Sequence, residues 1–140
     1  MTKRILLDTH VWVWLMLGDK RIGRATRGML EKAVPDGRLL VSVISAWEVA
    51  MLEVKGRLTL ASDCETWVRD ALAAPGIRLT DLTPHIAISS TRLPGAFHGD
   101  PADRILVATA RELEAVLLTA DQGILQYASG GHVQAMRAEP

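Results

Sequence analysis

Short apolar runs alternate along this chain with longer segments in which apolar residues recur at helical spacing. Short apolar runs that end at Asp, Gly or Pro are typical of buried strands, and the longer periodic segments are typical of helices. We predict strands at residues 5–7, 39–43, 77–82, 115–119 and 132–136. We predict helices at residues 11–17, 23–33, 46–55, 65–73, 85–92, 101–113 and 123–127.

The order of these elements predicts the fold class. Strands that alternate with helices form α/β folds, in which helices cover both faces of a parallel sheet. No internal repeat, linker or low-complexity segment interrupts the 140 residues. We therefore expect a single α/β domain over residues 1–140. Ser45 precedes the third predicted helix, and we predict that it caps that helix.

Composition narrows the class of protein further. A hydrophobic fraction of 49% and a mean hydropathy of +0.16 are typical of a globular domain with a substantial core. The formal net charge is zero, so no overall basic field indicates nucleic-acid binding. A lone cysteine, Cys64, excludes an internal disulfide and is consistent with the cytoplasm. The first apolar run ends at Asp8, so we expect neither a signal peptide nor a membrane span.

Acidic residues stand beside the apolar segments, where burial of a carboxylate costs several kcal/mol unless it is paired or metal-bound. They are Asp8, Glu48, Asp103 and Asp121. Ligands of parallel α/β sheets gather beyond the carboxyl ends of the strands. Asp8 and Asp121 each follow a predicted strand, and Asp103 begins the helix between them, so we expect at least these three at one edge.

This set of side chains favours a particular chemistry. Carboxylates without His or Cys partners select hard cations such as Mg²⁺ or Mn²⁺. Such a site is suited to phosphodiester hydrolysis, in which the metal polarises the phosphoryl group. Taken singly, each acid also has an ordinary structural explanation, as a helix cap, an exposed helix residue or a turn residue.

Four segments together resemble the motif series of PIN-domain proteins, and most closely the VapC-type toxins of bacterial toxin–antitoxin pairs. They are Leu7-Asp8-Thr9-His10, Ser45-Ala46-Trp47-Glu48, Asp100-Pro101-Ala102-Asp103-Arg104 and Leu118-Thr119-Ala120-Asp121. The resemblance implies a ribonuclease that depends on Mg²⁺ or Mn²⁺, with a VapB-type antitoxin partner and frequent homodimers. By position, Asp8, Glu48 and Asp103 match the three core acids, and Asp121 matches a more variable fourth.

Supporting roles follow from the same resemblance. Thr119 matches a hydroxyl position that often supports the site, and Arg104 lies in the motif of Asp103. Asp100 competes with Asp121 as the fourth ligand. Pro101 after Asp100 is typical of a helix start. We therefore expect Asp100 to be an N-cap whose carboxylate accepts hydrogen bonds from backbone amides. We therefore favour Asp121.

The tryptophans indicate a partner surface, and three other functions are compatible with parts of the sequence. We expect helices around Trp12, Trp47 and Trp67 to form a groove for an antitoxin segment. A haloacid-dehalogenase-like phosphatase would need a second Asp two residues after Asp8, where His10 stands. A receiver-type phosphoacceptor would need acids before Asp8 and a late Lys, and both are missing. A non-catalytic interaction module with a structural acid cluster remains the alternative outside enzymes.

Overall fold

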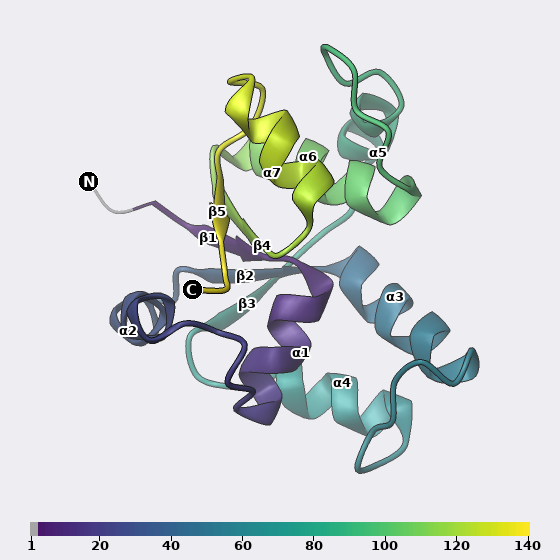
Figure 1. The fold of residues 1–140 in the computed structure, drawn as a ribbon. Coiled ribbons are helices and arrows are strands. Elements are labelled where there is room, and N and C mark those ends of the chain that lie inside the picture. Colours follow the sequence, from purple (N-terminus) through teal and green to yellow (C-terminus); the bar gives the residue numbers. More distant parts are fainter. Residues whose placement is uncertain (1–2) are drawn as a thin grey trace.

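A computed structural model describes residues 3–140 of the chain, and Figure 1 shows its fold. The strands are β1 (Ile5–Leu7), β2 (Leu39–Ser42), β3 (Ile77–Thr80), β4 (Val116–Thr119) and β5 (Ala135–Arg137). The helices are α1 (Thr9–Leu17), α2 (Arg24–Ala33), α3 (Val43–Val54), α4 (Cys64–Leu72), α5 (Pro84–Ser90), α6 (Pro101–Leu113) and α7 (Gln122–Ser129). Each predicted element has a counterpart in the structure.

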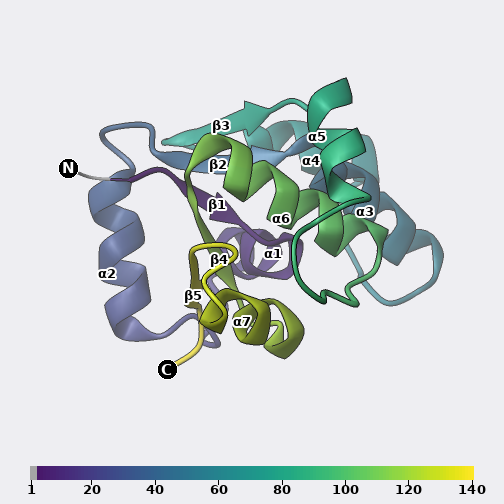
Figure 2. The same ribbon diagram turned by 90° about the horizontal axis from the view of Figure 1, so that it is seen from above.

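The strands form one parallel sheet in the order β3-β2-β1-β4-β5, which Figure 2 shows from above. β1 lies at the centre and is fully buried, as its purely apolar sequence predicts. β3 forms one edge, where its two middle residues, Arg78 and Leu79, are exposed to solvent. The predicted parallel α/β sheet is confirmed. Because all strands run the same way, the residues that follow β1, β2 and β4 meet at one edge.

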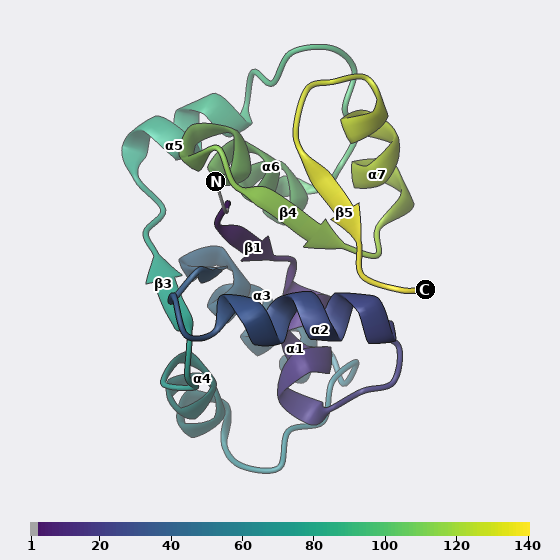
Figure 3. The same cartoon turned by 90° about the vertical axis from the view of Figure 1, so that its left-hand side faces the viewer.

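Helices cover both faces of the sheet, as predicted. Figure 3 shows α5, α6 and α7 on one side of the strands and α1, α2 and α4 on the other. Strand residues alternate between the two sides: Ile5 and Leu7 join the core with α1, and Leu6 joins the core with α6. α3 lies at the carboxyl edge of the sheet and contributes residues to both cores. Hydrophobic packing on both faces of the sheet therefore fixes the position of α3 at this edge.

The start of α3 differs from the prediction. Ser42, the last residue of β2, caps the helix and accepts a hydrogen bond from the Ile44 amide at 3.1 Å. The strand passes into the helix without a loop, so the helix begins before Ser45. Ser45 is instead buried inside the first turn. The predicted cap, Ser45, is three residues too late, because Ser42 and Ser45 are equally good capping residues by type.

The last strand also lies later than predicted, since the turn at Gly130 and Gly131 continues through His132. Val133 then packs into the core, and only residues 135–137 pair with β4. Within residues 3–140, no helix has the length and apolar character that crossing a membrane requires.

Candidate functional site

Asp8 lies at the centre of the carboxyl edge, where β1 ends and α1 begins. Its side chain is 5% exposed. One carboxylate oxygen accepts a hydrogen bond from the Thr9 amide at 2.7 Å, and the other accepts one from the Thr119 hydroxyl at 2.6 Å. Burial raises the pKa of Asp8, although both hydrogen bonds favour the ionised form. The neighbouring strands β1 and β4 bring these residues together, since Leu7 pairs with Leu118.

Glu48 projects from α3 beside Asp8 and is 7% exposed. The Thr9 hydroxyl lies 2.5 Å from Glu48 Oε1 and 2.8 Å from the Ser45 hydroxyl. Thr9 has a single hydroxyl proton, so when it donates to the carboxylate, Ser45 must donate to Thr9. Burial raises the pKa of Glu48, and the nearby charge of Asp8 adds to the rise.

The hydrogen bonds of Thr9 and Ser45 that hold the Glu48 carboxylate were not predicted from the sequence. Both residues lie inside the motifs that contain Asp8 and Glu48, and that proximity is the signal that could have indicated them. Ser45 and Glu48 are three residues apart on α3, so their side chains share one helical face. Thr9 closes the network from the neighbouring helix.

Asp103 also has a raised pKa, and it lies close to the other acids. It lies in the first turn of α6, and Asp100 caps this helix by accepting a hydrogen bond from the Asp103 amide at 2.8 Å. Burial raises the pKa of Asp103 to about 8, and the charges of Asp8, Asp100, Asp121 and Glu48 contribute to the rise. Asp103 therefore carries a proton through much of the neutral range when no cation is present.

Asp121 follows β4 and caps α7. Its carboxylate accepts a hydrogen bond from the Ile124 amide at 3.0 Å, and its own amide donates to the Thr119 hydroxyl at 2.9 Å. The prediction that Asp100 is an N-cap is confirmed, but Asp121 is one as well. Capping therefore does not separate these two residues as candidates for the fourth ligand.

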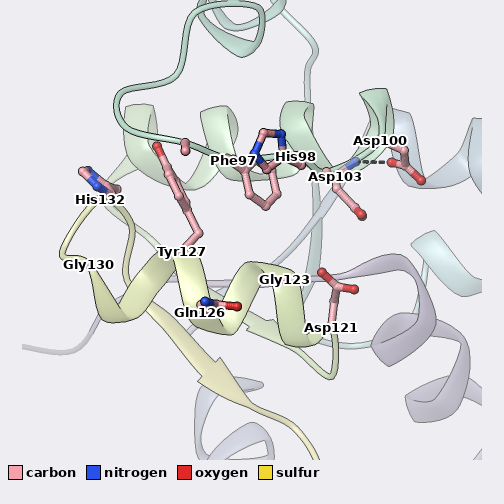
Figure 4. Close-up of a pocket in the computed structure, with 12 residues that line it drawn as sticks. Phe97, His98, Asp100, Asp103, Asp121, Gly123, Gln126, Tyr127, Gly130 and His132 are labelled. Atoms are coloured by element: carbon pink, nitrogen blue, oxygen red, sulfur yellow. Dashed lines mark hydrogen bonds between the residues drawn. The ribbon is translucent and has the colours of Figure 1, made fainter.

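A pocket of about 640 Å³ opens beside these acids (Figure 4). Asp103 and Asp121 face each other across one end of it, and Asp100 lies next to Asp103. α7 forms one wall, and the loop before α6 forms the other. Its lining residues are Ala96, Phe97, His98, Gly99, Asp100, Asp103, Asp121, Gly123, Gln126, Tyr127, Gly130 and His132.

Arg104 follows Asp103 in sequence but makes its hydrogen bonds elsewhere. Its guanidinium donates to the Ser90 carbonyl at 2.8 Å and to the Phe97 carbonyl at 2.6 Å. These bonds tie the loop between α5 and α6 to the start of α6. Arg104 therefore holds the loop that forms one wall of the pocket, and it forms no ion pair with the acids.

The tryptophans do not share one surface. Trp12 is 0% exposed and packs edge-on against Trp67, which is 9% exposed, with ring centroids 5.4 Å apart. The predicted groove is therefore wrong for Trp12 and Trp67, because both side chains serve the core between α1 and α4. Trp47 is 55% exposed on α3 and is available to a partner.

The acids as a group fit a hard cation by their chemistry. Within residues 3–140, the recorded ion pairs involve other residues, so the charges of the cluster are not neutralised by Lys or Arg. As the side chains stand in this part of the chain, no three His, Cys, Asp or Glu residues converge closely enough to hold one ion. Asp103 and Asp121 nevertheless face each other across one end of the pocket, and Asp100 lies next to Asp103.

Comparison with known proteins agrees with the fold. The PIN domain family model matches residues 5–130, and the chain belongs to this family. Ribonuclease VapC22 of Mycobacterium tuberculosis is 36% identical over 118 residues, which cover 84% of this chain and 87% of the relative.

Solved structures with the same fold include complexes of two proteins. DNA-bound VapBC from Salmonella typhimurium has a TM-score of 0.69 at 13% identity, and the match covers 97% of this chain and 98% of that one. VapBC2 from Rickettsia felis, bound to a promoter DNA fragment, has a TM-score of 0.67 at 13% identity, covering 95% and 97%. At these identities the likeness concerns the fold.

Proposed function

We propose that this protein is a divalent-metal-dependent endoribonuclease that acts as the toxin of a toxin–antitoxin pair. The observation that carries this proposal is the group of carboxylates around Asp103, whose pKa of about 8 reflects burial and uncompensated negative charge. A bound cation would remove the repulsion among these carboxylates, so the group favours a cation over a neutral or negative ligand. Its relative in Mycobacterium tuberculosis is named a ribonuclease, which supports RNA as the substrate.

In this proposal Asp8, Glu48, Asp103 and Asp121 hold Mg²⁺ or Mn²⁺. The bound metal supplies Lewis-acid stabilisation of the scissile phosphate. Thr119 holds Asp8 in position, and Thr9 holds Glu48, so both buried carboxylates present fixed oxygens.

We further propose a VapB-type antitoxin as the partner, a homodimer as the assembly and the cytoplasm as the location. Solved proteins of the same fold were obtained as VapBC complexes, which supports an antitoxin here. Trp47 is exposed and adjoins Glu48 in sequence, so a partner bound over Trp47 would lie close to the site. A basic side chain from that partner would relieve the repulsion among the acids and inhibit cleavage.

Cleavage of short RNA by the purified protein tests the proposal. We expect activity with Mg²⁺ or Mn²⁺, little with Zn²⁺, and none in excess chelator. Asp8→Asn, Glu48→Gln and Asp103→Asn should each remove most activity while the fold is retained. Asp70→Asn is the matched control, because Asp70 is exposed on α4 outside the site. Chelator-resistant cleavage, or full activity in two of the three site variants, would contradict the metal site. Antitoxin binding without any cleavage would favour the interaction module.

A further inference from the structure

The pocket beside the acids extends well beyond them, along one face of α7. Gly123, Gln126, Tyr127 and Gly130 line it, and their spacing places them on a single helical face. His98 lies on the opposite wall, in the loop before α6 (Figure 4). A volume of about 640 Å³ exceeds what a metal and its waters need. The far part of the pocket is therefore available to a portion of the substrate.

Charge indicates which portion of the substrate fits there. The lining residues all belong to the described part of the chain, and they include neither Lys nor Arg. Carboxylates occupy one end of the pocket and repel a phosphate, and Arg104 and Arg111 behind the far wall donate to backbone carbonyls of Phe97 and His132 and do not line the pocket. An uncharged group is favoured instead. In RNA the uncharged group next to each phosphate is the nucleoside, whose base is planar and carries hydrogen-bonding edges.

The far wall is aromatic and rigid. The rings of Tyr127 and His132 stack with centroids 4.8 Å apart, and Phe97 packs against Tyr127 at 4.8 Å. The Tyr127 hydroxyl donates to the Pro94 carbonyl at 2.5 Å, which holds the ring in place. Tyr127 and Phe97 are only 5% and 8% exposed, so the partly exposed His132 ring is the member of this wall that a base can reach. Unpaired RNA bases are commonly bound against aromatic side chains, including His.

Gln126 supplies the polar contact in this part of the pocket. Among residues 3–140, the hydrogen bond recorded at Gln126 reaches its backbone carbonyl, which accepts from Ser129. Its exposed side-chain amide is thus left to a ligand. An amide offers a donor and an acceptor side by side, and this pairing can distinguish one base edge from another.

We propose that this pocket binds the base adjoining the scissile phosphate, and that Gln126 sets the base preference of cleavage. The inference rests on the proposed ribonuclease function and names the part of the substrate that the site reads. Gln126 is a specificity residue in this scheme, and the acids at the other end of the pocket would hold the metal that neutralises the phosphate.

A pool of short single-stranded RNA with randomised sequence, cleaved in Mg²⁺ and sequenced, tests this assignment. Wild-type protein should prefer one base, or one class of bases, at a position next to the cleaved bond. Gln126→Ala should reduce that preference by roughly tenfold, the typical effect of losing a paired base contact. Gln126→Glu, which exchanges the donor for a second acceptor, should shift the preferred base. Gln122→Ala is the matched control, since Gln122 is an exposed glutamine of α7 outside the pocket lining.

A binding measurement separates failure of this inference from failure of the proposed function. The same pool is selected for binding to Asp103→Asn protein, with and without Gln126→Ala, so that base preference is read without cleavage. Absence of cleavage by the wild type would overturn the ribonuclease function. An unchanged preference in Gln126→Ala, in cleavage or in binding, would overturn the role of Gln126 alone. A loss of preference in Gln126→Ala that Gln122→Ala does not share would support it.

Discussion

The Thr119 hydroxyl lies 2.6 Å from an oxygen of Asp8, although the two residues are 111 positions apart in the chain. Both are buried at the carboxyl edge of the sheet, one after β1 and the other at the end of β4. The same hydroxyl accepts a hydrogen bond from the Asp121 amide. Thr119 thus connects two proposed metal ligands from adjacent strands, and its removal should affect both.

Thr119→Val should destabilise the fold and lower activity together. The substitution keeps the shape of the side chain but leaves the Asp8 carboxylate with one hydrogen bond fewer, at a cost of about 1–3 kcal/mol. The pKa of Asp8 should rise further, because the lost bond favours its ionised form. Urea unfolding and RNA cleavage measure the two effects. Thr109→Val is the control, since Thr109 is equally buried but bonds only to its own helix, at the Ile105 carbonyl.

Stability without metal should fall as the pH rises. The pKa of Asp103 is raised from 3.8 to about 8, so the folded protein retains a proton that the unfolded chain releases. The contribution of Asp103 to stability is therefore full below pH 3.8 and is lost as the pH rises through about 8. Melting temperatures in chelator at pH 5 and pH 8 should differ less in Asp103→Asn than in the wild type. An equal pH dependence in both would show that the charge of Asp103 is not the cause.

Metal titration should decide between Asp100 and Asp121. Both residues are N-caps, and Asn caps as well as Asp, so Asp100→Asn and Asp121→Asn should each cost only about 0–1 kcal/mol of stability. We expect Asp121→Asn to weaken Mn²⁺ affinity more, because Asp121 leaves the sheet beside Asp8. Isothermal calorimetry with Mn²⁺ measures both variants. A larger loss in Asp100→Asn would assign the fourth ligand to Asp100.

Arg104→Ala should loosen the pocket wall while the acids remain in place. The variant loses the bonds to the carbonyls of Ser90 and Phe97, each worth about 1–3 kcal/mol when a charged donor is removed. Amide hydrogen exchange should then quicken in residues 93–99. Arg92→Ala is the comparison, because Arg92 is exposed and its side chain bonds to the neighbouring Thr91 hydroxyl and not to the loop. Unchanged exchange in Arg104→Ala would mean that other contacts hold this loop.

Two tryptophan variants should behave in opposite ways. Trp12→Ala leaves a large cavity beside Trp67 and should cost about 3–5 kcal/mol of stability. Trp47→Ala removes an exposed side chain and should leave stability nearly unchanged, but it should weaken antitoxin binding. Thermal unfolding and a binding assay with the co-expressed antitoxin distinguish the two roles. Normal antitoxin binding by Trp47→Ala would remove Trp47 from the proposed interface.

Local patterns in the sequence determined the elements and the acidic character of the site. The apolar run before Asp8 predicted a buried strand, and Pro101 after Asp100 predicted a capped helix start, because these features depend on neighbours within a few residues. The parallel sheet followed from the alternation of elements. That alternation also placed the residues after β1 and β4 at one edge of the sheet.

Only the tertiary structure decided which side chains meet at that edge. Thr9 contacts Glu48, and Thr119 contacts Asp8, because strand register and helix packing bring together positions that local spacing cannot relate. Likewise, the sequence does not distinguish the buried Trp12 from the exposed Trp47, since each lies in an apolar helix. The physical reason is that helix and strand formation follow from short-range periodicity, whereas burial and convergence depend on how elements pack across the sheet.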